Sequence, residues 1–175
     1  MKQTSIGIRL YASESEPTVQ NESGYLALNW TEIGEVTDLP DYGPTVQVIE
    51  SNTLKFGVTQ KFPGSTNYGS LAIGMDLDPD DSGQQFLESS LSLGGIRKSR
   101  SFRIKLKDTF NEYFQGMITS NVRGATGNSM VSSTVNTEIN TKITRAVNAA
   151  GTPNNALTSG ADYLTFNGAF LTYSL

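Results

Sequence analysis

Apolar and polar residues alternate with a period of two along most of the chain, a pattern typical of half-buried β-strands. The alternation predicts strands at residues 5–12, 25–36, 45–49, 55–61, 70–75, 102–107, 112–123 and 130–144. Within the second of these, Leu26, Leu28 and Trp30 fall on one side. The chain is therefore expected to be mainly β.

The strand predicted at 130–144 is the longest. Its odd positions are mostly β-branched and its even positions are polar, over about 15 residues or roughly 50 Å. A strand this long outgrows a chain of 175 residues unless it bends or pairs with neighbouring copies, and we expect neighbouring copies. The strand before it places Phe114, Ile118 and Val122 on one face.

One helix is expected at about 82–93, with Asp80, Asp81 or Ser82 as its N-cap and a glycine pair after its end. Residues 37–68 contain several prolines and glycines among short strands, which is typical of an excursion that carries contacts. Residues 1–145 form the expected domain. Residues 146–160 read as a connector and 162–175 as a terminal strand or arm.

Composition narrows the classes of function. The chain has no cysteine and no histidine, which excludes disulfide scaffolds, Cys or His zinc sites and histidine-based catalytic triads. Phosphate-binding glycine motifs are also missing. Paired carboxylates such as Asp38 with Asp41 match a glycosidase by residue type only. We therefore expect no enzyme, no cofactor and no metal.

Charge is divided unevenly along the chain. Residues 1–96 hold 13 acidic and 4 basic side chains, whereas residues 97–175 hold 4 acidic and 9 basic ones. Either the two halves interleave and neutralise each other, or they form opposed surfaces suited to head-to-tail association of copies. The charged candidates for contacts between copies are Arg97, Lys98, Arg100, Arg103, Lys105, Lys107, Asp76, Asp78, Asp80 and Asp81.

Two of these groups have other interpretations. The acidic run 76–83 opens like a calcium loop, but position six is Asp81 where the turn requires glycine, so an acidic helix start is favoured. The basic run 96–107 could attract nucleic acid, but its one aromatic residue, Phe102, alternates towards the core. No segment is apolar enough for a membrane span, and the first 17 residues lack the core of a secretory signal, so cytoplasmic folding is expected.

Several stretches, in order, resemble the tail tube (major tail) proteins of long-tailed, non-contractile bacteriophages. They are residues 30–39 (WTEIGEVTDL), 69–76 (GSLAIGMD), 80–87 (DDSGQQFL), 102–122 with its YFQGMI strand, and the Gly127-Asn128-Ser129 turn. The resemblance covers about residues 1–145. It implies a β-sandwich or barrel-like fold with one flanking helix, and a long hairpin that joins an inner β-barrel shared between subunits.

The resemblance also implies hexameric rings stacked head to tail in a virion tail, assembled in the bacterial cytoplasm. Tape-measure, terminator and tail-tip proteins would be partners, and phage DNA would pass through the lumen without specific binding. Segments 37–68 and 146–175 would be arms between rings. The candidates to face the lumen are Ser132, Thr134, Asn136, Glu138, Asn140 and Lys142. The alternative is a non-catalytic β-sandwich binding module, for example for carbohydrate, which would need an exposed aromatic platform.

Overall fold

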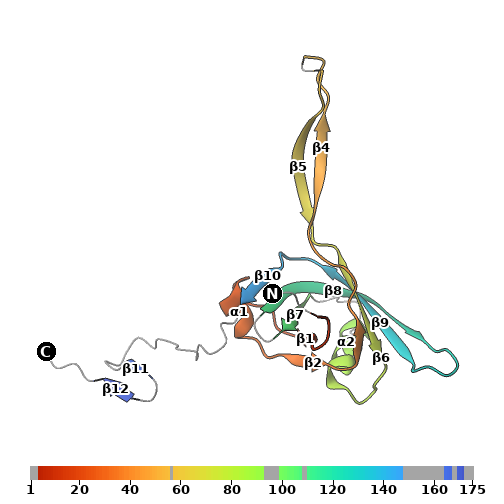
Figure 1. Cartoon of the computed structure of the whole chain (residues 1–175). Helices are drawn as coiled ribbons and strands as arrows, with labels where there is room; N and C mark the ends of the chain where they lie inside the picture. Colours follow the sequence, from red (N-terminus) through yellow and green to blue (C-terminus); the bar gives the residue numbers. More distant parts are fainter. Residues whose placement is uncertain are drawn as a thin grey trace.

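The computed structural model describes residues 4–55, 57–92, 99–107, 110–147, 164–166 and 169–171. Figure 1 shows a β-rich body from which one long hairpin projects. The elements are β1 (Arg9–Ser13), α1 (Glu22–Leu26), β2 (Thr31–Ile33), β3 (Val36–Asp38), β4 (Thr45–Ser51), β5 (Gln60–Asn67), β6 (Ser70–Asp76), α2 (Ser82–Ser92), β7 (Arg100–Lys107), β8 (Phe110–Gly124), β9 (Ser132–Ile139), β10 (Thr144–Val147), β11 (Leu164–Phe166) and β12 (Ala169–Leu171). Neither helix of the described residues is long and apolar enough to cross a membrane.

The main sheet of the described chain curls round on itself. It has eight antiparallel strands in the order β2-β1-β7-β8-β9-β6-β3, with β10 beside β8. The two edge strands, β2 and β3, are consecutive in the sequence and only Gly34 and Glu35 separate them. A link this short spans only about 10 Å, so the two edges lie together. Glu35 adopts a φ of 55°, the left-handed conformation that suits a sharp corner. The predicted β-sandwich or barrel-like fold is confirmed.

The main core lies inside the curled sheet. Its buried residues are Leu10, Ala12, Ile33, Leu71, Ile73, Met75, Leu87, Phe102, Ile104, Phe114, Ile118, Val135, Ile139 and Ile143. Phe102 on β7 and Phe114 on β8 stack with their ring centroids 5.5 Å apart. Helix α2, which confirms the helix predicted at 82–93, contributes Leu87 to this core.

Helix α2 is fastened to the corner between β2 and β3. The Asp81 carboxylate accepts hydrogen bonds from the backbone N–H of Gln84 at 2.7 Å and of Gly34 at 3.2 Å. It therefore caps the helix and holds the corner at the same time. Gly83 permits the close approach, because a Cβ at this position would lie 2.2 Å from the Glu32 carbonyl oxygen.

A second, aromatic cluster packs outside the main core and corrects the strand predicted at 25–36. Residues 22–26 form helix α1, whose N-cap Asn21 accepts from the Gly24 N–H at 3.0 Å. The helix buries Tyr25, which stacks on Tyr113 of β8 at 5.2 Å. The rest of the predicted strand divides at the corner into β2 and β3. The Asn21 cap of helix α1 and the corner between β2 and β3 therefore prevent the single strand that the alternation of apolar residues predicts.

A bulge in β8 reverses which residues face inward. The pairing of β8 with β9 shifts by one residue between Ile118 and Ser120. Before the shift, even-numbered residues such as Phe114 and Ile118 are in the core. After it, Val122 is 59% exposed, contrary to the prediction that it shares their face. One extra residue in a strand inverts every later side chain, which explains the error.

The strand predicted at 130–144 is also corrected. Strand β9 covers only Ser132–Ile139, and its predicted alternation holds there, with odd residues inward. Residues 140–143 then interrupt the ladder, and β10 resumes pairing with the first part of β8. These four residues lie opposite only two residues of β8, so the chain forms an irregular bend here. The chain thus bends over its own body, one of the two solutions that its length allowed.

Strands β6 and β7 confirm the predictions at 70–75 and 102–107. Strand β1 begins at Arg9, later than predicted, because a turn with Gly7 at a φ of 89° precedes it. Strand β5 begins at Gln60, because most of the predicted strand at 55–61 belongs to the turn after β4. In place of a single terminal strand, β11 and β12 pair with each other. The connector at 146–160 lies outside the described residues from position 148 onward.

Candidate assembly surfaces

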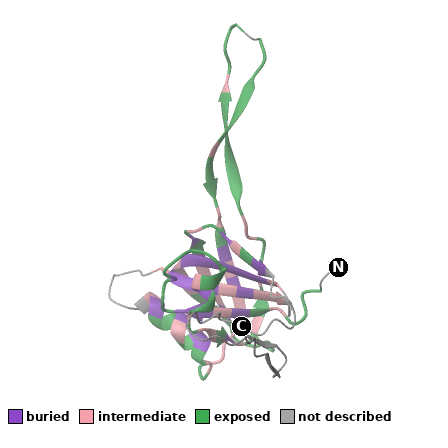
Figure 2. Cartoon of the chain, turned by 90° about the vertical axis from the view of Figure 1, so that its left-hand side faces the viewer, coloured by how far each residue is buried: buried purple, intermediate pink, exposed green. Residues whose placement is uncertain are grey.

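The projecting hairpin, residues 45–67, is called the arm here. Strands β4 and β5 pair only with each other, and Figure 2 shows them exposed along their length. Its exposed apolar residues are Val46, Val48, Ile49, Leu54, Val58 and Phe62, each between 48% and 106% exposed. An isolated hairpin is marginally stable in water, and exposed apolar clusters mark contact surfaces. The arm has the composition of a segment that another surface covers.

The base of the arm is anchored in the body through Tyr42. Its hydroxyl donates a 2.5 Å hydrogen bond to the carboxylate of Glu112, which is only 5% exposed. Arg145 donates to the other carboxylate oxygen at 2.8 Å. Burial, followed by the hydrogen bond and charge of Glu112, raises the pKa of Tyr42. The buried carboxylate is therefore satisfied from both sides, by the arm base and by β10.

The outer surface of β6, β9 and the second half of β8 forms a continuous face, called the polar face here. Cross-strand neighbours on it include Ala72 with Asn136 and Asn136 with Ser120. Its members are Ser70, Ala72, Gly74, Asp76, Met117, Ser120, Val122, Gly124, Ser132, Thr134, Asn136 and Glu138. All are exposed or half-exposed. The only charged side chains among these residues are acidic.

The six lumen candidates do not all lie on this face. Ser132, Thr134, Asn136 and Glu138 are on it. Asn140 and Lys142 lie beyond β9 in the interrupted segment, and Lys142 instead lines a groove of about 590 Å³ beside α1 and the arm base. The structure thus separates them from the other four candidates because the strand ends at Ile139.

The basic candidates are used largely within the subunit. Arg100 is 2% exposed, donates to the Ser90 hydroxyl at 3.0 Å and lies 3.6 Å from Glu14, which corrects its assignment to a contact between copies. Arg103 lies over the rings of Tyr11 and Tyr113 at 5.0 and 5.9 Å. Both side chains therefore make contacts within their own body.

The remaining basic candidates are less informative. Lys105 is half-exposed and pairs in register with Arg9 of β1. Lys107 ends β7, and its side chain is outside the described part of the structure, as are Arg97 and Lys98 entirely.

The acidic candidates gather where β6 meets α2. The Asp81 carboxylate caps helix α2, and the Asp78 carboxylate accepts a hydrogen bond from the Asp80 N–H at 3.0 Å. Asp76 ends β6 on the polar face, while Asp80 is exposed. Within the part of the chain that the structure describes, no three such side chains could share a metal ion. Local backbone contacts thus account for much of the calcium-like pattern.

Ion pairs join the acidic and basic halves of the chain. Arg100 pairs with Glu14, and Arg123 pairs with Glu88 at 2.8 Å. The two halves also share a sheet, since β1 pairs with β7. These contacts support interleaving of the two halves within one body.

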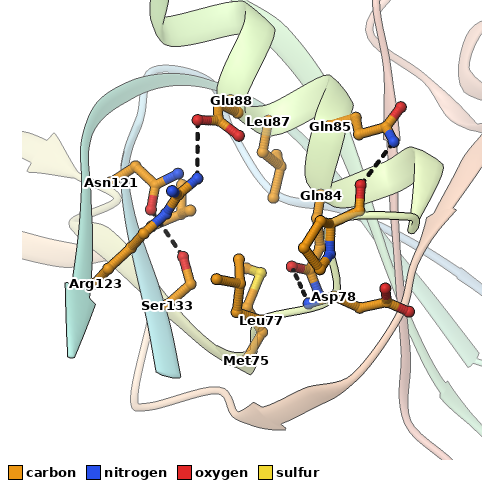
Figure 3. Close-up of a pocket in the computed structure, with 12 residues that line it drawn as sticks. Met75, Leu77, Asp78, Gln84, Gln85, Leu87, Glu88, Asn121, Arg123 and Ser133 are labelled. Atoms are coloured by element: carbon orange, nitrogen blue, oxygen red, sulfur yellow. Dashed lines mark hydrogen bonds and ion pairs between the residues drawn. The ribbon is translucent and has the colours of Figure 1, made fainter. Parts of the chain in front are cut away.

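A small pocket lies between α2 and the sheet. Its lining comes from four separate segments, so no local sequence pattern predicts it. It has a volume of about 120 Å³. Figure 3 shows Met75, Leu77 and Leu87 pointing into it, with the ion pair between Arg123 and Glu88 across one side. Met75 and Leu87 are at most 2% exposed, so the floor is apolar.

Trp30 bears on the binding-module alternative. Its indole N–H donates to the Tyr25 carbonyl oxygen at 3.1 Å, and its ring lies 5.8 Å from that of Tyr113. Trp30 therefore belongs to the aromatic cluster of the body and does not provide the exposed platform that a carbohydrate-binding module needs.

Comparison with known proteins identifies solved structures with a similar fold. No family model matches the chain, and no curated protein matches its sequence. Solved structures do match. A chain from the PVC sheath/tube terminator of an extracellular contractile injection system aligns with a TM-score of 0.61 and 10% identity, covering 83% of this chain and 96% of that one.

Two further structures agree. A chain from the anti-feeding prophage baseplate, six-fold symmetrised, has a TM-score of 0.59 and 11% identity over 83% of this chain and 97% of its own. A chain from the tail of an empty gene transfer agent particle, with C6 symmetry, has a TM-score of 0.56 and 12% identity over 81% and 97%. The chain therefore has the fold of proteins from phage-tail-like particles. Contractile systems share that fold, so the comparison does not support the non-contractile type that the sequence resemblance indicates.

Proposed function

We propose that this chain is a structural subunit of a phage-tail-like tube, with a mechanical and not a catalytic role. The fold it shares with chains of injection systems and gene transfer agent tails supports this function. The observation that carries it is the presence of two distinct surfaces on one body. One is the arm, whose strands pair only with each other and expose apolar side chains, and the other is the polar face of the main sheet. Heterologous contacts of one kind, repeated between identical copies, generate filaments.

In this proposal the polar face lines the channel. Most of its side chains are small or polar, with Met117 and Val122 as the larger apolar ones, and its charged members, Asp76 and Glu138, repel the phosphates of DNA. Such a wall remains hydrated and offers no cationic trap, so a duplex slides along it. The sheets of neighbouring subunits would join in an inner barrel, which leaves no strand edge exposed to the channel.

Rings of six subunits, stacked head to tail, fit the six-fold symmetry stated for two of the similar structures. The arm would cross from one ring to the next, and residues 146–175 are a second candidate arm. Tape-measure, terminator and tail-tip proteins would complete the tail, assembled in the bacterial cytoplasm and carried in the virion.

The test is assembly of the recombinant chain, followed by negative-stain electron microscopy and sizing chromatography. We expect stacked rings or tubes with a central channel, formed alone or after seeding with tail tips. Replacing Val48 and Ile49 together with serine should abolish tubes and leave the melting temperature of the monomer within a few degrees. The matched control is Val19→Ser, which removes an equally exposed apolar side chain outside the arm. A chain that remains monomeric when seeded would refute the proposal.

A further inference from the structure

The arm and the small pocket lie at opposite ends of one strand. Strand β6 begins at Ser70, three residues after the arm ends, and finishes at Asp76, where the pocket begins with Met75 and Leu77. Figure 1 shows the arm leaving one side of the body while α2 lies on the other. An arm of one copy therefore points towards the pocket side of a copy stacked above it in the same orientation.

Among the described residues at the tip of the arm, Leu54 is the most exposed apolar side chain. Leu54 lies in the turn between β4 and β5 and is 106% exposed, more than the other exposed apolar residues of the described chain. Removing such a group from water lowers the free energy of the system. The arm itself cannot cover Leu54, because its two strands pair only with each other.

The pocket matches that side chain in size and in character. A cavity of about 150 Å³ holds a benzene molecule, so a pocket of about 120 Å³ accommodates the isobutyl group of one leucine. Met75, Leu87 and Val135 form its apolar floor and are each at most 2% exposed. The described chain leaves this floor unfilled.

The charges around the two partners are complementary. Lys55 is the one charged residue between positions 51 and 59. Residues 70–96, which include one wall of the pocket, contain five acidic residues and no basic one. Arg123 is the basic residue at the pocket, and Glu88 neutralises it at 2.8 Å. Asp78, Glu88 and Arg123 are the charged residues that line the pocket, so its lining carries one net negative charge, opposite in sign to Lys55.

We propose that Leu54 of one copy inserts into the pocket beneath α2 of a second copy, with Met75, Leu87 and Val135 as its floor. This inference rests on the proposed tube and identifies the contact that stacks its subunits. The contact is heterologous: tip on one side, pocket on the other. It therefore repeats without closing.

Cysteine crosslinking tests this contact directly, because the chain has no cysteine of its own. Copies carrying Leu54→Cys are mixed with copies carrying Leu77→Cys, assembled, and oxidised with diamide. We expect covalent dimers of the two variants in tubes and none in dilute monomer. The matched control replaces Leu77→Cys with Val19→Cys, an exposed position away from the pocket, and should give no such dimers.

A second measurement does not depend on crosslinking. Leu54→Ser should raise the protein concentration needed for tubes roughly tenfold to a hundredfold, while Leu54→Met should stay within about threefold of the natural chain. Both variants should keep the monomer's melting temperature, since Leu54 touches nothing in its own body. Tubes that form normally but give no dimers between positions 54 and 77 would overturn this inference and leave the tube intact. No tubes from the natural chain, even when seeded, would overturn the proposed function itself.

Discussion

The hydroxyl of Tyr42 lies 2.5 Å from the buried carboxylate of Glu112, and this hydrogen bond ties the base of the arm to the central strand of the body. Only Gly43 and Pro44 separate Tyr42 from the first residue of β4. The direction in which the arm leaves the body therefore depends on a contact that is some distance from its tip.

Tyr42→Phe should lower the free energy of unfolding by about 1.5–3 kcal/mol, the usual contribution of a hydrogen bond to a charged group. The aromatic ring keeps its place in the variant, so the loss of stability reports the contribution of the hydroxyl group alone. Urea unfolding followed by tyrosine or tryptophan fluorescence measures it. Tyr68→Phe, which also removes one hydroxyl near the arm base, is the control and should cost less than about 0.5 kcal/mol. An equal loss in the two variants would contradict the role given to Glu112.

Stability should fall as the pH rises above about 10, where tyrosines of the unfolded chain ionise. Burial raises the pKa values of Tyr25, Tyr42 and Tyr113 in the folded chain. A raised folded pKa means that the stabilising contribution is complete below the unfolded pKa and is lost progressively above it. Melting temperatures measured from pH 8 to 11 should decline more steeply for the natural chain than for Tyr42→Phe. Parallel declines would count against the raised pKa of Tyr42.

Gly83→Ala should destabilise the chain by about 1–3 kcal/mol or more. The added Cβ would meet the Glu32 carbonyl oxygen at 2.2 Å, so α2 must move away from β2. Gly127→Ala is the control, because an added Cβ there meets nothing within 4 Å. Thermal unfolding of both variants, followed by circular dichroism, compares them. The expectation fails if the two variants melt together.

Arg100→Ala should cost about 2–4 kcal/mol of unfolding free energy, because it empties a buried site and leaves the Ser90 hydroxyl without its donor. Glu14→Gln should cost less than about 1 kcal/mol, since that carboxylate is 71% exposed. Denaturant unfolding of the monomer distinguishes the two. A stable Arg100→Ala monomer that fails only in assembly would return Arg100 to the contacts between copies.

Asn136→Arg with Glu138→Arg should leave assembly intact and slow DNA delivery, because the two arginines would bind phosphates along the channel. The measurement is the rate of DNA release from particles that carry variant tubes. Asn136→Gln with Glu138→Gln removes the acidic group without adding cations and should release DNA at close to the natural rate. Loss of tubes from a soluble, folded double-arginine variant would place these residues at a contact between copies.

The sequence predicts the class of fold well and the faces of its strands less well. Strands β6, β7 and β9 alternate cleanly because each has one side in the core and one outside, so periodicity reports burial directly. The segment containing Tyr25 misleads, since its apolar residues serve a helix and a second cluster. Val122 misleads because the bulge beside Thr119 leaves no trace in the pattern of apolar residues.

Among the residues of the candidate surfaces, some were also predictable from the sequence and others were not. Thr134 and Asn136 were predictable as outward-facing from alternation alone. Arg100 was not, because its burial depends on Ser90 and Phe86 of a helix that packs back across β7. The pocket beneath α2 required the fold itself, since its floor combines residues as far apart as Met75 and Val135.

The bulge in β8 also bears on how such a chain can change over evolutionary time. The residues after it alternate in the opposite phase from those before it, so one added residue reassigns everything from Ser120 to Gly124. Thr119 is the extra residue, so its deletion would remove the bulge and leave Ser120 and Val122 on the outer face, opposite Asn136 and Thr134. Relatives that lack this extra residue should therefore still place the residues equivalent to Ser120 and Val122 on the outer face of the sheet.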